Sequence, residues 1–466
     1  ARRDTNGPSA RGIDRFGVAP RALAGAEMMS NLPGSLASVI ESSPESARAW
    51  MNQMCMAASG KAMDMALMGM HLDMEGMLLD QDGEAGEGDK PKEEAKDKKK
   101  DDKKPEEKKE EKFDRLDGIP DWFIGPMLAD LVAHEVGHTL GLRHNFKASG
   151  IYSFKDINSD TMKGKKAFTG SVMDYNPVNI SMGGGPVQGD YTMIDIGPYD
   201  MWAIEAGYTF GDVKEVMKRV AEPELIYGTD EDTFGPDPLA RRYDFAADPM
   251  DFAASRLNLA KYHRERLLEK YVKEGQSWAK ARRGYMMTLN EHLGAVSHMT
   301  RWVGGSYVNR DRKGDPNGRP PVQNVPVAQQ RAALKFVIDN AFFDEAFGLT
   351  PEMLAHLTVD KFWDAGGSPG DDATWPVHDR ILGIQASVMT GLMNPTTMRR
   401  VLDNEWRTPA GEDAVTLPEV MGAISAAVWK EIDQSPGSRY TARQPMISSL
   451  RRNLQREYVE RLIDLA

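Results

Sequence analysis

The stretch from His134 to His144 constrains the fold of this chain more than any other part of its sequence. His134 and His138 stand four residues apart, a spacing that places both side chains on one face of a helix. Gly141 follows where a helix would end in a left-handed residue, and His144 comes three residues later. The pattern predicts a helix that ends in a sharp turn, which brings the third imidazole back beneath the first two.

Three imidazoles gathered in this way predict a metal site with catalytic chemistry. Neutral histidines suit Zn²⁺, and three of them leave a fourth coordination position open for water. Glu135 is next to the first ligand but does not point at the metal, so we expect it to act as general base on that water. The alternative is a structural or surface histidine cluster, and such spacing among only nine histidines argues against it.

The same run carries the motif HExxHxxGxxH and thereby resembles the metzincin clan of zinc metallopeptidases. The clan's second mark is a tight turn containing Met below the metal, and Ser171–Tyr175 is similar to that turn. The resemblance implies that Met173 forms an apolar floor under the imidazoles without ligating the metal. It also implies that Tyr175 ligates zinc or stabilises the oxyanion. The alternatives are an ordinary core Met and a partly buried Tyr.

Further runs make the chain similar to bacterial zinc-dependent metalloproteases with a "Met-zincin" domain: His144–Ser149, Ile196–Tyr208 and Trp302–Gly305. This resemblance implies a zinc endopeptidase that acts on a peptide or protein substrate and is secreted or periplasmic. Two alternatives stay open. One is a zinc-stabilised, non-catalytic module that binds peptides or proteins, and the other is a metal hydrolase of a non-peptide amide.

The sequence departs from the clan pattern in two respects. Asn145 stands where many metzincins have an acidic residue. Metzincins also build an upper sheet before the active-site helix, and its edge strand binds the substrate backbone. Residues 1–112 show little of the alternation that such strands need. We expect these strands to lie upstream of Ala1 in a precursor, or the cleft to be incomplete in this chain alone. The chain opens without an initiator Met or a signal peptide, which is typical of a processed chain or a fragment.

Charge and hydrophobic pattern divide the chain into four parts and predict a mainly α fold. Residues 84–112 contain 12 acidic residues and 11 lysines, so we expect a disordered insert. Residues 1–83 combine a Gly/Pro-rich segment with Met-rich helices, 113–210 hold the peptidase core, and 211–466 form an α-helical domain. Amphipathic helices are predicted over 212–221, 252–273, 275–299, 327–347, 351–363, 377–390, 396–405, 417–432 and 446–465.

Two helical segments invite more detailed predictions. From Pro44 to Leu79 we expect a hairpin that breaks at Gly60 and uses methionine as core filler, with a soft-metal site for Cu(I) as the less favoured reading. The active-site helix should carry Pro126 in its first turn. Its buried face should be supplied by Leu128, Leu131, Val132, Val136 and Leu140.

Composition excludes several other functions. The net charge of −12 argues against a nucleic-acid binder, and no apolar run is long enough to span a membrane. Cys55 is the only cysteine, which excludes a disulfide framework and a cysteine-based zinc site, so we interpret it as a buried thiol. An acidic loop is a candidate for Ca²⁺, with a solvated turn as the favoured alternative. Its carboxylates are Asp230, Glu231, Asp232 and Asp237.

Overall fold

The computed structural model describes residues 55–77, 115–116, 118–183, 185–360, 372–432 and 440–465. Helices dominate these residues, which confirms the mainly α fold class. Their strands form two small antiparallel sheets. In one, β1 (Arg115–Leu116) pairs with β2 (Ile119–Pro120), and in the other, β3 (Ser306–Val308) pairs with β4 (Val322–Asn324). The charged segment 84–112 lies outside the described residues, and the four domain boundaries stay predictions.

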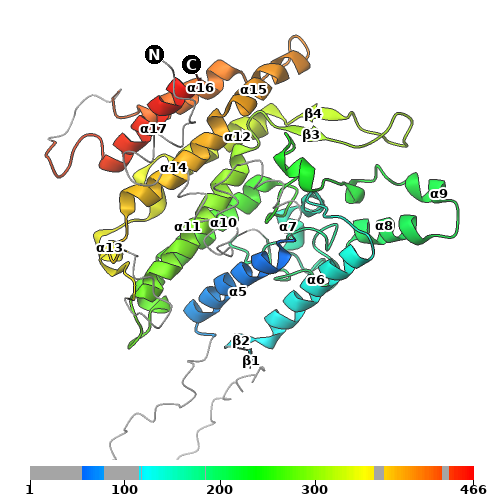
Figure 1. Ribbon diagram of the computed structural model, residues 1–466, viewed down its shortest axis with the longest axis horizontal. Coiled ribbons are helices and arrows are strands. Elements are labelled where there is room, and N and C mark those ends of the chain that lie inside the picture. Colours follow the sequence, from blue (N-terminus) through cyan, green and yellow to red (C-terminus); the bar gives the residue numbers. More distant parts are fainter. Residues whose placement is uncertain are drawn as a thin grey trace, which may run out of the picture.

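Two helices that are well separated along the sequence lie side by side (Figure 1). They are α5 (Ala57–Met74) and α6 (Asp121–Thr139). An ion pair between Lys61 Nζ and Asp130 Oδ2, 2.6 Å apart and almost fully buried, joins them. The buried ion pair thus fixes the position of α5 relative to the helix that carries His134 and His138.

The packing of α5 agrees in part with the Met-rich hairpin. Met68, Met70 and Met74 are buried in the main hydrophobic core, as the core-filler interpretation expects. Gly60, however, lies inside the first turn of α5 and does not break it. Its lack of a side chain admits the ring of Tyr243, since a Cβ there would lie 2.4 Å from Tyr243 Cε1. The half of the expected hairpin before Cys55 lies outside the described residues.

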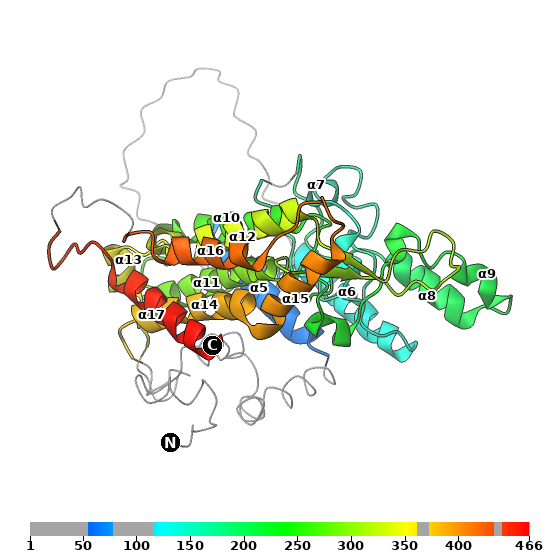
Figure 2. The same ribbon diagram turned by 90° about the horizontal axis from the view of Figure 1, so that it is seen from above.

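The C-terminal half is a packed set of helices, and it lies at the opposite end of the molecule from α8 (Pro198–Tyr208) and α9 (Val213–Met217) (Figure 2). Its members are α10 (Pro249–Arg264), α11 (Ala279–Thr300), α12 (Val327–Ala341), α13 (Pro351–His356), α14 (Val377–Met393), α15 (Pro395–Arg407), α16 (Leu417–Val428) and α17 (Ser449–Leu465). The longest of them, α11, contacts α10, α12, α13 and α14.

Each helix predicted between residues 252 and 465 overlaps an observed helix, and most ends shift by a few residues. The helices expected over 252–273 and 327–347 end early, at Arg264 and Ala341, and a short π-helical turn and a short 3₁₀ turn follow them, respectively. The helix expected over 351–363 is shorter, because a tight turn at Leu357 ends it, with a Thr358 N–H to His356 O hydrogen bond of 3.0 Å. Phe123 and Met127 of α6 share one apolar core with Trp302 and Tyr285. α6 is therefore fixed against the C-terminal helices.

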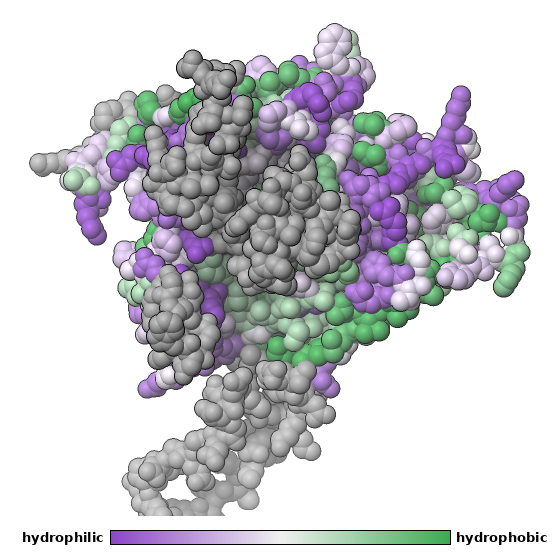
Figure 3. Space-filling model, in the orientation of Figure 1, coloured by the Kyte–Doolittle hydropathy of each residue, from purple (hydrophilic) through white to green (hydrophobic). Residues whose placement is uncertain are grey.

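The predicted faces of α6 need correction. The helix begins at Asp121, so Pro126 lies inside it and not in its first turn. The additional N-terminal turn contains Phe123 and Ile124, which are both buried and hold that turn against the core. Four of the five aliphatic residues predicted to be buried are exposed, and Figure 3 shows a hydrophobic strip along this edge of the molecule. These four, called the α6 strip below, are Leu128 (48% exposed), Val132 (60%), Val136 (47%) and Leu140 (43%).

Among the described helices, none has both the length and the apolar character that crossing a bilayer requires.

The middle of the chain also contains two short helical elements, α7 (Phe154–Ile157) and a 3₁₀ turn over Asp230–Phe234.

Candidate metal centre

The turn that follows α6 has the geometry that the sequence predicts. Gly141 adopts φ +88°, a backbone conformation that side chains with a Cβ disfavour. Its N–H donates to the His138 carbonyl, and the next residue, Leu142, donates to Gly137, both at 3.0 Å. This double hydrogen bond is the Schellman motif that ends many helices. It sends the chain back toward the helix, so that His144 faces the two histidines of α6.

The three imidazoles converge. The ring centroid of His138 lies 4.8 Å from that of His134 and 4.8 Å from that of His144, and the remaining pair lies 5.4 Å apart. His134 and His144 are buried, while His138 is half-buried. The structure thus brings together all three residues that the spacing predicts as zinc ligands.

Each imidazole is oriented by a hydrogen bond from its Nδ1 atom. His134 Nδ1 lies 2.7 Å from the carbonyl oxygen of Val172, and His138 Nδ1 lies 3.1 Å from that of Leu142. His144 Nδ1 lies 2.8 Å from Asp230 Oδ2. These partners only accept, so Nδ1 is the donor in each ring and Nε2 is the nitrogen left to bind a cation. This is the tautomer that a metal ligand needs.

Electrostatics around His134 favour the neutral ring. Burial lowers the pKa of His134 to about 4, and the two neighbouring imidazoles act in the same direction. A buried, neutral imidazole with a free Nε2 is a ready donor to a cation at neutral pH.

Asp230 is the residue in this centre whose role the sequence does not reveal. It accepts from His144 and also from the guanidinium of Arg242, at 2.8 Å from each. Burial alone would raise the pKa of Asp230, but these two hydrogen bonds hold it below its ordinary value. Asn145 helps to place the loop, because its side chain donates to Ile226 O and accepts from Gly228 N. The amide that departs from the clan pattern thus ties the third histidine to the loop of Asp230.

The other carboxylates of the acidic loop each pair with a cationic side chain. Glu231 binds Arg143 at 2.7 Å, Asp232 binds Arg310 and Asp237 binds the buried Lys147 at 2.7 Å. The loop is therefore organised by ion pairs and by its link to His144. Calcium binding at this loop stays a prediction.

The turn around Met173 lies directly beneath the imidazoles. Met173 is fully buried, and a Cβ added to Gly137 would lie 2.3 Å from its sulfur, so the thioether packs on the α6 backbone between the two histidines. The carbonyl of the same residue accepts from Asn145 N at 3.1 Å. This is the position that the resemblance implies for an apolar floor.

Asp200 of α8 anchors this turn. Its carboxylate accepts from Ser171 Oγ at 2.5 Å, from Val172 N at 2.7 Å and from Gly197 N at 3.2 Å. Burial raises the pKa of Asp200 above its ordinary value, although these hydrogen bonds oppose the shift. Since the Val172 carbonyl orients His134, the carboxylate of Asp200 acts on the metal centre through the turn. The resemblance carried by the run Ile196–Tyr208 gives no sign of this contact.

Tyr175 reaches the centre as well. Its hydroxyl lies 3.0 Å from His144 Nε2 and accepts from the backbone N–H of Met56 at 2.7 Å. The side chain is buried against Phe146, and burial raises the pKa of the phenol above its ordinary value. The hydroxyl is therefore neutral, and it stands beside a candidate ligand atom.

Cys55 also lies at the centre, so the interpretation of a buried thiol without chemical context is wrong. Its sulfur is half-buried and lies 3.4 Å from His134 Nε2. The thiol donates to Glu135 Oε1 at 3.3 Å, which places the predicted general base on the exposed side of the same group. Burial raises the pKa of Cys55. Sequence pattern could not reveal this, because 79 residues separate the cysteine from His134.

These side chains fit a zinc ion. Among the described residues, one group of metal-binding side chains occurs, and it consists of Cys55, His134, His138 and His144. One donor atom from each lies within 4.8 Å of the others, so that small side-chain movements bring all four onto one ion. Imidazole nitrogen and thiolate sulfur are ligands that zinc prefers.

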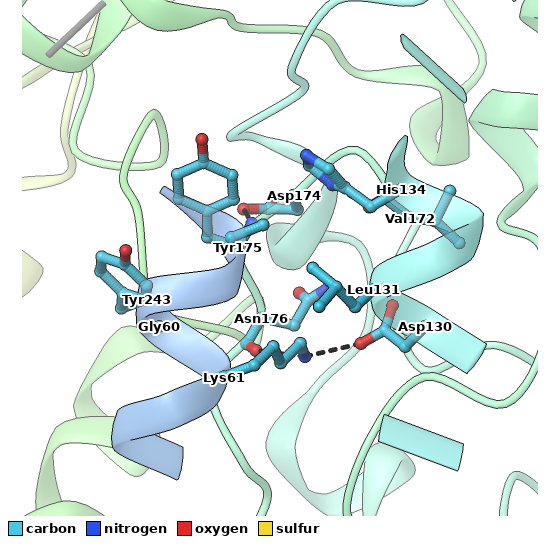
Figure 4. Close-up of a pocket in the computed structure, with 11 residues that line it drawn as sticks. Gly60, Lys61, Asp130, Leu131, His134, Val172, Asp174, Tyr175, Asn176 and Tyr243 are labelled. Atoms are coloured by element: carbon cyan, nitrogen blue, oxygen red, sulfur yellow. Dashed lines mark hydrogen bonds and ion pairs between the residues drawn. The ribbon is translucent and has the colours of Figure 1, made fainter. Parts of the chain in front are cut away.

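A small cavity of about 10 Å³ lies behind the imidazoles, between α5 and α6 (Figure 4). His134, Tyr175 and Asn176 line it, together with the Lys61–Asp130 ion pair. The amide of Asn176 is buried and has no hydrogen-bond partner among the described residues. A cavity of this size has room for about one water molecule.

Comparison with known proteins agrees with the geometry. A family model described as Met-zincin matches residues 117–436, more than half of the chain, and this range contains all the histidines of the centre. No curated protein and no solved structure gives a significant match.

Proposed function

The chain belongs to the Met-zincin family, and from this membership we propose that it is a zinc-dependent endopeptidase. The resemblance to the metzincin clan is thereby confirmed at the level of the family. The observation that carries the proposal is the set of three Nδ1 hydrogen bonds, which makes Nε2 the ligand atom of each of His134, His138 and His144.

We assign roles to the side chains as follows. Zinc, when bound by the three imidazoles, polarises the scissile carbonyl and lowers the pKa of the attacking water. Glu135 accepts the proton of that water at a carboxylate oxygen and passes it to the leaving amine. Tyr175 donates a hydrogen bond to the oxyanion of the tetrahedral intermediate. Met173 supports the imidazoles from below and has no chemical role.

A non-catalytic module stabilised by zinc is the second candidate. The observation in its favour is Cys55, because four protein donors around one ion are typical of structural zinc sites. Against it stands Glu135, an acidic side chain next to the ligands that a structural site does not need. By family resemblance alone, we also propose that the chain acts outside the cytoplasm.

Zinc content and peptide cleavage test the proposal together. Wild type, Glu135→Gln and Cys55→Ala are loaded with zinc, and their cleavage of casein and of a peptide library is compared. Glu352→Gln, which changes an exposed glutamate on α13, is the matched control. We expect Glu135→Gln to keep one equivalent of zinc and to lose turnover, whereas Glu352→Gln keeps both.

Two results would contradict the endopeptidase. If Glu135→Gln cleaves as fast as wild type, its role as general base is wrong. If all variants bind zinc and none cleaves, even with Cys55 removed, the binding module becomes the better description.

A further inference from the structure

The thiol of Cys55 lies where it contacts two groups of the proposed mechanism. Its sulfur is 3.4 Å from His134 Nε2, the atom that would hold the metal, and 3.3 Å from Glu135 Oε1. It is also 3.6 Å from the Tyr175 hydroxyl. A group in this place stands between the ligands and the base, where an attacking water would have to be.

The backbone next to Cys55 is held by contacts that do not involve sulfur. The N–H of Met56 donates to the Tyr175 hydroxyl at 2.7 Å, and the carbonyl of Met56 accepts from Tyr243 Oη at 3.2 Å and from Gly60 N at 3.0 Å. The close approach of Tyr243 to Gly60 fixes the first turn of α5 in the same position. The cysteine is therefore carried to the centre by the packing of α5.

We propose that Cys55 is a fourth zinc ligand, which keeps the centre closed to substrate until the start of α5 moves away. This inference rests on zinc binding by the three histidines. With zinc held by the three imidazoles, the Cys55 sulfur would take the fourth position in place of a water molecule, and the thiol proton would pass to the Glu135 carboxylate. The reverse movement would return the proton to sulfur and readmit a water molecule to that position.

The contacts make closure and hydrolysis mutually exclusive. In the closed form, Glu135 accepts from the cysteine and the Tyr175 hydroxyl donates to the cysteine sulfur at 3.6 Å, so that neither is free to act on a peptide bond. Breaking the three backbone contacts of Met56 would release the base, the tyrosine and the fourth position together. The position of the start of α5 would therefore keep the zinc-loaded centre inactive, a state called latent below.

Cobalt substitution tests the ligand directly. Because Cys55 is the only cysteine, a thiolate-to-cobalt charge-transfer band in the near ultraviolet can come from no other residue of the chain. We expect the band in the Co²⁺-loaded wild type and its complete loss in Cys55→Ala. The double variant Cys55→Ala/Met63→Cys moves the thiol to an exposed position on α5 and should also lack the band. A wild-type protein that binds one equivalent of Co²⁺ without the band would overturn the proposal while leaving the three-histidine site intact.

Thiol reactivity gives a second readout that does not depend on catalysis. We expect Ellman's reagent to react readily with the metal-free wild type and at least tenfold more slowly after zinc is added. In the double variant, zinc should leave the rate unchanged. Equal rates for wild type with and without zinc, at a measured zinc content of one equivalent, would contradict ligation.

Cleavage separates latency from a structural role of the thiol. If the centre is latent, zinc-loaded Cys55→Ala cleaves casein at least tenfold faster than wild type and binds zinc more weakly. If the cobalt band is present but Cys55→Ala cleaves no faster than wild type, closure by Cys55 is wrong. If no variant binds cobalt or zinc, the proposed function fails together with this inference, and the metal analysis identifies that case.

Discussion

The Nδ1 atom of His144 lies 2.8 Å from Oδ2 of Asp230, although 86 residues separate them in the sequence. This contact gives the third imidazole its tautomer and its orientation, and Arg242 holds the same carboxylate from the other side. The ligand and its partner come from different loops, so the centre is completed only when the chain beyond α8 folds back onto it. Such partners commonly matter to metal affinity almost as much as the ligands themselves.

Asp230→Asn should weaken zinc binding by about 10- to 100-fold, because the amide cannot fully replace the carboxylate as acceptor for His144. Competition with a chromogenic chelator measures the affinity, and circular dichroism verifies the fold. Glu231→Gln is the matched control, since it alters the neighbouring carboxylate, which is exposed and pairs with Arg143. Equal affinities in the two variants would show that Asp230 does not support the ligand.

Gly137→Ala should destabilise the centre, because its new Cβ would lie 2.3 Å from the Met173 sulfur in a fully buried contact. Overpacking of this kind costs about 1–3 kcal/mol of the free energy of unfolding. Gly294→Ala in α11 is the control, since no atom lies within 4 Å of its Cβ position. That variant should gain about 0.5–1 kcal/mol from helix propensity. Urea unfolding of both variants measures the contrast, and a destabilised Gly294→Ala would count against the reasoning.

Asp200→Ala should lower both stability and zinc affinity. Removing the carboxylate leaves three donors near Ser171 without their acceptor, at a cost of about 3 kcal/mol. The loosened turn would no longer hold the Val172 carbonyl against His134. Asp195→Ala, which removes one exposed acceptor just before the same helix, should have a small effect on unfolding and none on affinity. Unchanged zinc affinity in Asp200→Ala would refute the link through the turn.

Asp64 gives the stability of the fold a specific pH dependence. Burial raises its pKa from 3.8 to about 6, although the nearby Lys61 opposes the shift. Between pH 3.8 and about pH 6, the Asp64 carboxyl has lost its proton in the unfolded chain and keeps it in the folded chain. The free energy of unfolding therefore falls as pH rises through this interval. Over the whole interval this costs on the order of 3 kcal/mol.

Asp64→Asn lacks this titration, and its stability relative to wild type should therefore increase from about pH 4 to about pH 6 and then level off. Chemical denaturation at a series of pH values measures the difference. A difference that stays constant with pH would show that the carboxyl of Asp64 titrates normally in the folded protein.

The local parts of the fold and of the centre could be predicted from the sequence. Two histidines four residues apart and the glycine after them determine a helix and its end, and both depend on neighbouring residues alone. The amphipathic helices after residue 252 follow for the same reason. The turn at Met173 was reached through resemblance, and the structure packs it against Gly137 of α6, while Asp200 of α8 holds it from the other side.

What could not be predicted depends on tertiary contact. Cys55 and Asp230 reach the centre from segments whose own patterns look like a core helix and a solvated turn. The α6 strip was predicted to be buried because its hydrophobic spacing is helical, yet spacing tells only which residues share a face. The face of α6 that meets the core is the one that carries Phe123 and Met127, because these two residues pack against the helical domain.

The α6 strip has a consequence for how the chain behaves at high concentration. Four aliphatic side chains face water on the helix that carries the metal ligands, and such a patch favours self-association. The net charge of −12 opposes this by repulsion between molecules, and that repulsion reaches only about 10 Å at 0.1 M salt. Added salt should therefore promote turbidity instead of suppressing it. Dilute buffer of low ionic strength is accordingly the condition in which the chain should stay monodisperse.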